Sequence, residues 1–378
     1  MSSKIKLSTP HMGGGELKYI QEALETNWVA PAGENITYFE NNLEEYLGQN
    51  LKVTALSSGT AAIHLALILA GVKKNDEVIC QSLTFAASAF PIMYQGATPI
   101  FVDSEKDTWN ICPKCLEEAI IDRISKGKKP KAIILVHIFG MPAKMDKIVS
   151  LAKKYEIPII EDAAEALGSE YKGKKCGTLG DFGVLSFNGN KIITTSGGGA
   201  LVTKKQALKE KAIFLATQSK DDELWYEHSN IGYNYRMSNI LAGIGRGQME
   251  TLHAHVRRRV EIHQFYEKLF KPIESVKIFS EYNSKIKSNH WLSCILFNSK
   301  SKRNPLGLFN HLKAHNIESK FIWKPLHLQP IFKENEFYGD NNIAETIFNT
   351  GLCLPSGSNL TTENKDTIAK VVLNYLDA

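Results

Sequence analysis

The sequence contains no hydrophobic run long enough to cross a membrane. No stretch reaches the roughly 18 apolar residues of a spanning helix, and residues 1–15 have no apolar core of the kind found in a signal peptide. The chain also has no large excess of positive or negative charge, since it contains 45 basic and 40 acidic residues. We therefore expect a cytoplasmic protein without a membrane partner.

One dense basic run is present, Arg257-Arg258-Arg259, and we interpret it as a solvated helix face. Neither interleaved aromatic residues nor a recognised binding module accompanies it, so no nucleic-acid partner is expected. Walker (GxxxxGK[ST]) and dinucleotide (GxGxxG) fingerprints are missing as well, which argues against a P-loop enzyme and a nicotinamide-dependent dehydrogenase. Internal repeats and low-complexity segments are also lacking.

The six cysteines are scattered rather than arranged as a disulfide framework, which is typical of a reducing compartment. The spacing Cys112-Pro113-Lys114-Cys115 is compatible with half of a zinc site or with a redox pair. No second CxxC and no HxxxH completes a ligand set, so we expect no metal.

What the chain does have is a long alternation of strand-like and helical segments between residues 50 and 245. Such alternation predicts an α/β fold with a mostly parallel sheet, helices on both faces, and ligands bound beyond the carboxyl ends of the strands. After Met249 the pattern becomes a long charged helix and then shorter mixed segments. We predict a large domain over residues 1–248, and a connecting helix with a small α+β domain over residues 249–378.

Two strand-to-helix turns carry candidate functional groups. Ser57-Ser58-Gly59-Thr60 precedes a helix, so its amides are either an anion site or an ordinary capped helix start. Asp162 ends a buried strand, where a carboxylate can hold a cationic ring nitrogen, although Asp162 and Glu165 also fit a capping box.

Lys191 lies between two strand-like runs, Ser186-Phe187 and Ile192-Ile193-Thr194-Thr195, and is followed by Ser196-Gly197-Gly198-Gly199. Desolvation there would lower the proton affinity of its amine and favour a Schiff base with an aldehyde. A phosphate cradle, a carboxylate and a lysine in this order are what pyridoxal phosphate requires of a protein.

With these motifs, and with Asn27-Trp28-Val29-Ala30 and Gly232-Tyr233-Asn234-Tyr235-Arg236-Met237-Ser238, nearly the whole chain resembles the DegT/DnrJ/StrS family. These are fold type I, pyridoxal phosphate-dependent nucleotide-sugar aminotransferases. The resemblance implies that Lys191 binds the cofactor covalently and shuttles a proton. It also implies that the remaining cofactor-binding residues are Gly59, Thr60, Phe85, Asp162, Glu165, Ser186, Asn188 and Asn234.

In detail, Phe85 would stack on the cofactor ring, Glu165 would lie near its phenolic oxygen, and Asn234 would reach the phosphate from the other subunit of an obligate homodimer. Asn188 is placed near the phosphate because it shares a strand register with Ser186. Sugar dehydratases of the same fold replace the lysine with histidine, so Lys191 argues against that reaction, and a non-catalytic regulator would have no reason to retain these residues together.

The family further implies L-glutamate as amino donor and a nucleotide-linked keto-sugar as acceptor, in glycan or polysaccharide synthesis. The sequence around Lys191 and Trp323 resembles the bacillosamine-type subgroup, which aminates C4 of UDP-4-keto-6-deoxy-N-acetylglucosamine. A dTDP- or GDP-linked acceptor, as in perosamine-type enzymes, stays an open alternative, and so does amination at C3. The implied substrate-binding residues are Asn27, Trp28, Val29, Ala30, Lys324, Pro325 and His327.

Overall fold

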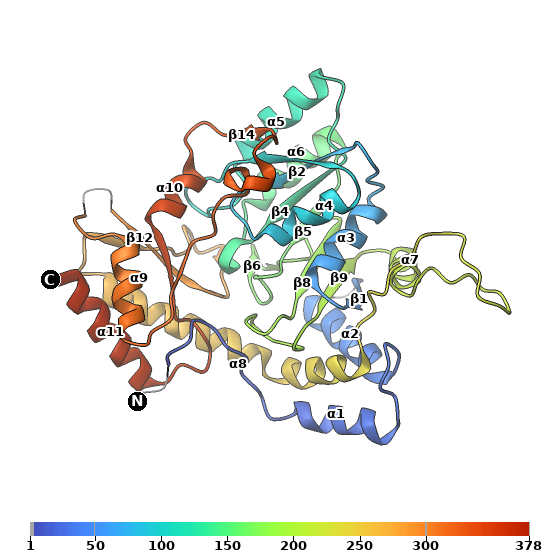
Figure 1. Ribbon diagram of the computed structural model, residues 1–378, viewed down its shortest axis with the longest axis horizontal. Coiled ribbons are helices and arrows are strands. Elements are labelled where there is room, and N and C mark those ends of the chain that lie inside the picture. Colours follow the sequence, from blue (N-terminus) through green and yellow to red (C-terminus); the bar gives the residue numbers. More distant parts are fainter. Residues whose placement is uncertain (1–3, 49, 299–300, 378) are drawn as a thin grey trace.

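The computed structural model describes residues 4–48, 50–298 and 301–377. Its centre is an eight-stranded sheet in the order β1-β9-β8-β5-β4-β2-β3-β14 (Figure 1). β9 is antiparallel to its neighbours β8 and β1, and the other pairings are parallel. The strands are β1 Lys52–Leu56, β2 Glu77–Gln81, β3 Thr98–Val102, β4 Ala132–Val136, β5 Ile159–Asp162, β8 Phe182–Ser186, β9 Gly199–Thr203 and β14 Phe337–Tyr338. The predicted mostly parallel sheet is thus confirmed.

Alternate residues of each strand enter two different cores, because successive side chains of a strand point to opposite faces. Ile133 and Leu135 of β4 pack with α2 (Glu34–Leu47), α5 (Pro113–Ser125) and α6 (Met145–Tyr155). Ala132 and Ile134 pack on the other face with α3 (Gly59–Leu69), α4 (Phe90–Tyr94) and α7 (Gln206–Ala216). Helices therefore cover both faces, as the alternating pattern predicts.

A long helix, α8 (Asn239–Phe270), runs beneath the large domain and into the small one, with α1 (Glu16–Glu25) packed along it (Figure 1). It starts at Asn239 rather than after Met249, because Ser238 caps it: the Ser238 hydroxyl accepts from the amide of Leu241. The predicted boundary at residue 248 consequently falls inside one continuous helix. Although α8 is long, no helix of the described chain is apolar enough over its length to cross a membrane.

The small domain is built on a four-stranded sheet in the order β10-β12-β15-β13. Its elements are β10 Val276–Ile278, β12 Ser293–Phe297, β13 Lys320–Phe321, β15 Gly351–Leu354, α9 Pro305–Ala314, α10 Ile343–Thr350 and α11 Thr362–Asp377. A third, three-stranded sheet joins the domains, because β11 (Ile286–Lys287) pairs with β6 (Glu170–Tyr171), which also pairs with β7 (Lys174–Lys175).

The basic run on α8 departs from its expected role. Arg257 and Arg258 are exposed, but Arg259 is buried and donates to the carbonyls of Trp291 (2.6 Å) and Ser356 (3.0 Å). Burial lowers the pKa of Arg259 to about 9. The interpretation of the whole run as a solvated face is wrong for this residue, since adjacent residues of a helix point in different directions.

Candidate active site

A cleft of about 520 Å³ opens where the carboxyl ends of the central strands meet the small domain. Ser186 ends β8 and Asp162 ends β5, while Trp291 and Lys320 approach from the small-domain side. Several residues that the sequence singles out line this cleft together: Gly59, Thr60, Phe85, Asp162, Glu165, Ser186, Asn188 and Lys191. The cleft therefore collects groups from Gly59 to Lys191, which lie 132 positions apart in the sequence.

One wall of the cleft is the first turn of α3. The Ser58 hydroxyl accepts from the amide of Ala61 (3.0 Å), so the capped helix start is real. The amides of Gly59 and Thr60 lie in the first turn, where the helix has no carbonyl acceptor for them, so they stay available to an anion. A Cβ on Gly59 would lie 3.1 Å from the Cβ of Ser186, which brings this turn against the end of β8. The cap and the anion site are thus compatible.

The Asp162 carboxylate lies at the base of the cleft and is almost fully buried. Its Oδ2 accepts from the Ser88 hydroxyl (2.7 Å) and its Oδ1 from the amide of Ala164 (3.1 Å). Burial raises the pKa of Asp162 above its usual value, although these hydrogen bonds and the Lys191 charge oppose the shift. A cation placed beside Asp162 would offset the cost of that burial by stabilising the charged carboxylate.

Lys191 lies in the cleft between an acid and an aromatic ring. Its Nζ is 3.6 Å from Oε1 of Glu165 and 4.1 Å from the ring centre of Trp291, whose indole N–H donates to the carbonyl of Asn190 (2.7 Å). The other oxygen of Glu165 accepts from the amide of Phe139 (2.7 Å). Burial raises the pKa of Glu165, and the Lys191 charge opposes this shift. The amine is therefore held in place without being tied to a strong ion pair.

Three local expectations are wrong, although Asp162, Glu165 and Asn188 still line the cleft. No helix follows Asp162, so Asp162 and Glu165 do not form a capping box; a turn leads Glu165 to the amide of Phe139 instead. Ile192–Thr195 is not a strand, and Asn188 lies beyond the end of β8 rather than in register with Ser186. Residues 188–197 form a loop, closed by the bond from the Thr195 amide to the Phe187 carbonyl (2.9 Å).

Other predicted residues do not line the cleft within the described part of this single chain. Asn27, Trp28, Val29 and Ala30 follow α1, where the carbonyl of Ala30 accepts from the amide of Asn239 (2.8 Å). His327 lies on the small-domain loop beside Lys324 and Pro325; its Nδ1 is 2.6 Å from the Ser82 hydroxyl. Asn234 is exposed. Their assignment to the site stays a prediction.

The sequence analysis did not identify Ser88, Trp291 and Lys320, which also line the cleft. Ser88 comes from a single 3-10 turn, and Trp291 enters the site some 100 residues after the lysine it touches. No local spacing links these residues to the motifs, so only the folded chain reveals them.

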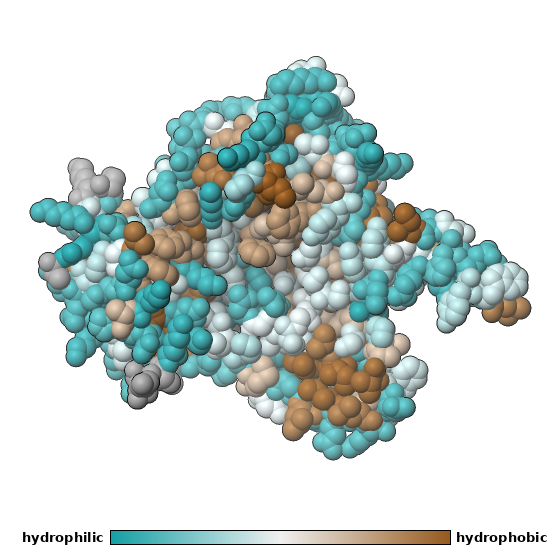
Figure 2. Space-filling model, in the orientation of Figure 1, coloured by the Kyte–Doolittle hydropathy of each residue, from teal (hydrophilic) through white to brown (hydrophobic). Residues whose placement is uncertain are grey.

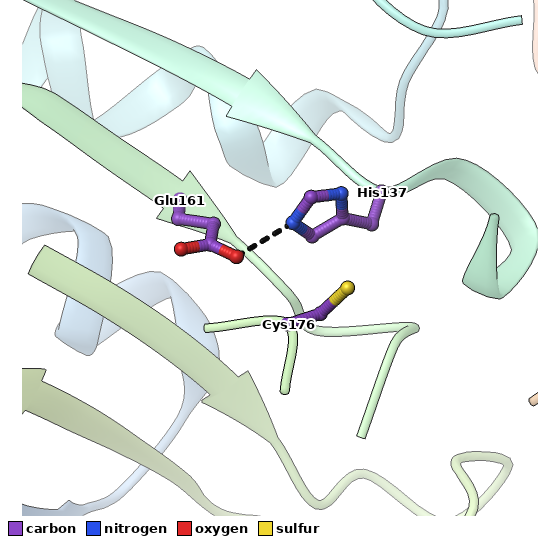
Figure 3. A group of neighbouring side chains, drawn as sticks. All are labelled: His137, Glu161 and Cys176. Atoms are coloured by element: carbon purple, nitrogen blue, oxygen red, sulfur yellow. Dashed lines mark hydrogen bonds and ion pairs between the residues drawn. The ribbon is translucent and has the colours of Figure 1, made fainter. Parts of the chain in front are cut away.

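Glu161, the residue before Asp162 in β5, points toward His137, with Cys176 nearby (Figure 3). The Glu161 carboxylate accepts from His137 Nε2 (2.8 Å) and from the amides of Gly177, Leu179 and Gly180. Burial would raise the pKa of Glu161, but these donors outweigh it and hold the pKa below its usual value. With both oxygens occupied by donors, this group anchors the 177–180 turn to the sheet rather than offering ligands to a metal.

The cleft suits pyridoxal phosphate on the chemistry of its donors. The free amides at the start of α3 fit a phosphate, the buried Asp162 fits a protonated ring nitrogen, and the Lys191 amine fits an aldehyde. Within the described chain, the buried Oδ1 of Asn190 has no hydrogen-bond partner, and Asn190 also lines the cleft. The site thus retains capacity for a polar ligand.

Comparison with known proteins supports this assignment. A profile of the DegT/DnrJ/EryC1/StrS aminotransferase family matches residues 10–373. The chain is 48% identical over 377 residues to the "Putative pyridoxal phosphate-dependent aminotransferase EpsN" of Bacillus subtilis, covering 99% of this chain and 96% of that protein. It is 39% identical over 361 residues to the GDP-perosamine synthase of Escherichia coli O157:H7, covering 95% of each.

A further relative is the UDP-4-amino-4,6-dideoxy-N-acetyl-beta-L-altrosamine transaminase of Campylobacter jejuni, 35% identical over 295 residues, with 78% of this chain and 77% of that protein covered. Among solved structures, the PLP form of Spr1654 from Streptococcus pneumoniae superimposes with a TM-score of 0.90 at 26% identity, covering 99% of this chain and 100% of that chain.

Proposed function

We propose, from the premise that this chain belongs to the DegT/DnrJ/EryC1/StrS aminotransferase family, that it moves the amino group of L-glutamate to C4 of a nucleotide-linked 4-keto-6-deoxy sugar. The family makes the chain a pyridoxal phosphate-dependent sugar aminotransferase. Our proposal adds the donor, the position of amination and the acceptor, UDP-4-keto-6-deoxy-N-acetylglucosamine.

The observation that carries the proposal is the position of the Lys191 amine, in the same cleft as Asp162 and the amides of α3. When bound, the cofactor supplies an electron-accepting ring that stabilises negative charge beside the transferred nitrogen. Asp162 would keep a proton on the ring nitrogen, and the Gly59 and Thr60 amides would hold the phosphate. Lys191 Nζ would carry the proton between the nitrogen-bearing carbon of the substrate and the aldehyde-derived carbon of the cofactor, with Glu165 and Trp291 fixing its direction.

The nucleotide is the finer part of the proposal. The motif around Trp323 favours a UDP sugar, and the relative from Campylobacter jejuni is named for a UDP-linked amino sugar. A GDP-linked acceptor is the second candidate, because the chain is 39% identical to a GDP-perosamine synthase. Both candidates use the same chemistry at C4 and differ in how the base is recognised.

We also propose that the enzyme works as a homodimer. Figure 2 shows a hydrophobic patch around α1, where Leu17 and Leu24 are 70% and 57% exposed. The arm after α7 extends from the molecule (Figure 1) and carries Leu224 and Ile231, which are 99% and 82% exposed. Such apolar exposure is typical of a surface that a second copy covers, and the exposed Asn234 lies at the base of this arm.

The test is the visible absorption of the holoenzyme. We expect the yellow colour of the bound cofactor to fade on addition of L-glutamate and to return with UDP-4-keto-6-deoxy-N-acetylglucosamine. Return only with a GDP- or dTDP-linked keto-sugar would overturn the nucleotide, and a colour that glutamate leaves unchanged would overturn the donor. D-Glutamate is the matched control and should have no effect.

Lys191→Ala is expected to abolish transamination while leaving the fold intact, because it removes the covalent attachment and the proton carrier together. Activity should fall by at least about a thousandfold. Lys147→Ala, which removes an exposed lysine of α6, serves as control and should keep full activity. Substantial turnover by the Lys191 variant would contradict the assigned role, and circular dichroism of both variants checks the fold.

A further inference from the structure

The first turn of α5 carries the cysteine pair that the aminotransferase reaction does not use. Cys112 occupies the N-cap position, Pro113 begins the helix, and Cys115 follows within the first turn. Cys112 is half-buried, whereas Cys115 is buried. This turn belongs neither to the cleft nor to α1 and the arm, which lie elsewhere in the molecule (Figure 1).

The two sulfur atoms have different environments. The Cys115 thiol donates to Oδ1 of Asp340 (3.6 Å), and Asp340 is also paired with Lys114 Nζ (2.7 Å). The neighbouring Cys115 thiol and the amides of Cys115 and Lys114 lower the pKa of Cys112, while its contact with Cys112 and burial raise the pKa of Cys115. The more exposed sulfur, that of Cys112, therefore loses its proton more readily than the buried sulfur of Cys115.

A zinc site does not account for this pair. Among the described residues, groups of three potential ligands within 4.8 Å of one another are His137–Glu161–Cys176 and His263–Glu281–His290, and neither includes Cys112 or Cys115. A structural zinc ion needs four ligands. This turn offers only the two thiols and the exposed carboxylate of Asp340, which already binds Lys114.

We propose that Cys112 and Cys115 form a thiol–disulfide exchange site for small-molecule disulfides. Cys112 is the attacking sulfur, Cys115 is the resolving sulfur, and Asp340 accepts the proton that Cys115 releases. The arrangement combines a partly exposed sulfur at the start of a helix with a buried partner three residues on, which are the features of reactive CxxC pairs.

The exchange balances with oxidised glutathione as the oxidant. The Cys112 thiolate attacks one sulfur of the S–S bond, forms a mixed disulfide and releases one glutathione thiolate. Cys115 then gives its proton to Asp340 and attacks the Cys112 sulfur, which forms the Cys112–Cys115 disulfide and releases the second glutathione thiolate. The two cysteines lose two electrons, which reduce the S–S bond of oxidised glutathione to two thiolates. One thiolate takes the proton that Asp340 received from Cys115, and the other takes from solvent the proton that Cys112 gave up before the attack.

The chain offers an internal comparison in a second cysteine pair. Cys294 on β12 lies opposite Cys353 on β15, with their sulfur atoms 3.6 Å apart. Both are fully buried, and burial raises the pKa of Cys294 well above its usual value. These two sulfur atoms are close together but lie out of reach of solvent, so the pair should not exchange in the folded protein.

The experiment treats the reduced holoenzyme with oxidised glutathione and follows the intact mass and the number of free thiols. We expect the wild type to lose two thiols without gaining mass from glutathione. Cys115→Ser should stop at one bound glutathione, and Cys112→Ser should react at least about tenfold more slowly. Asp340→Asn should accumulate the mixed disulfide before closure.

Cys294→Ser is the matched control and should react like the wild type. Equal rates for the wild type and Cys112→Ser would overturn the proposal, as would loss of thiols at Cys294 and Cys353 instead. Binding of one zinc ion by the reduced wild type, lost in Cys112→Ser, would replace the exchange site with a metal site. Aminotransferase activity of each variant reports that the fold is retained.

Discussion

At the scale of single residues, neighbouring carboxylates on β5 have opposite tasks. Asp162 faces the cleft and Glu161 faces the opposite side of the sheet, toward His137, because successive strand residues alternate. Each carboxylate accepts from a different set of donors. We therefore expect neutralisation of Asp162 to affect activity and neutralisation of Glu161 to affect stability.

Asp162→Asn is expected to lower transamination by about a hundredfold or more, since the amide cannot hold a charged ring nitrogen. Thermal stability should change little, because an amide oxygen can still accept from Ser88 or Ala164. Glu161→Gln is the neighbouring control. It should lower the free energy of unfolding by about 1–3 kcal/mol, since its amide group would face the donors of the 177–180 turn. If Asp162→Asn and Glu161→Gln lost the same activity and had the same melting temperature, the two carboxylates would not have these separate roles.

At the scale of elements, the site depends on how closely β9 approaches the start of α3. A Cβ on Gly199 would lie 2.3 Å from the carbonyl carbon of Ser58 and 2.4 Å from the amide of Gly59. Gly199→Ala is therefore expected to destabilise the protein by about 1–3 kcal/mol and to weaken cofactor binding. Gly197→Ala, which meets nothing within 4 Å, should stay within about 0.5 kcal/mol of the wild type. Denaturant unfolding and cofactor titration would compare them, and equal stabilities would refute the close approach.

The contact between α8 and the small-domain sheet predicts a pH dependence. His263 of α8 stacks on His290 at 3.7 Å, and burial lowers the pKa of His263 to about 3. Below about pH 6.5 the unfolded chain binds this proton while the folded chain does not, so stability falls as the pH drops. The contribution reaches about 2 kcal/mol at pH 5.

We expect the melting temperature of the holoenzyme to fall between pH 7 and pH 5, and to fall less in His263→Gln. The conservative change keeps a polar group near Ser280 and Ser293, the hydroxyl partners of His263. His315→Gln on the exposed end of α9 is a control that should retain the wild-type slope. An unchanged slope in His263→Gln would show that other groups titrate instead.

At the scale of the whole molecule, two chains should complete each other's sites. If Asn234 serves the partner's phosphate, Lys191→Ala and Asn234→Asp homodimers should each be nearly inactive. Mixing equal amounts after dissociation should restore about a quarter of the wild-type sites, because half of the dimers are mixed and each has one intact site. Activity that stays at the sum of the two variants would place Asn234 in its own chain's site.

The sheet-forming pattern, the family and the groups at the ends of β5 and β8 could be predicted from the sequence, because strand periodicity and short motifs are local properties. Tertiary structure decided the surroundings of Lys191, since Trp291 and Lys320 arrive from another domain and carry no local signal. It also decided that Arg259 is buried while Arg258 beside it is exposed. Burial depends on which helix face meets a neighbour, and only packing chooses that face.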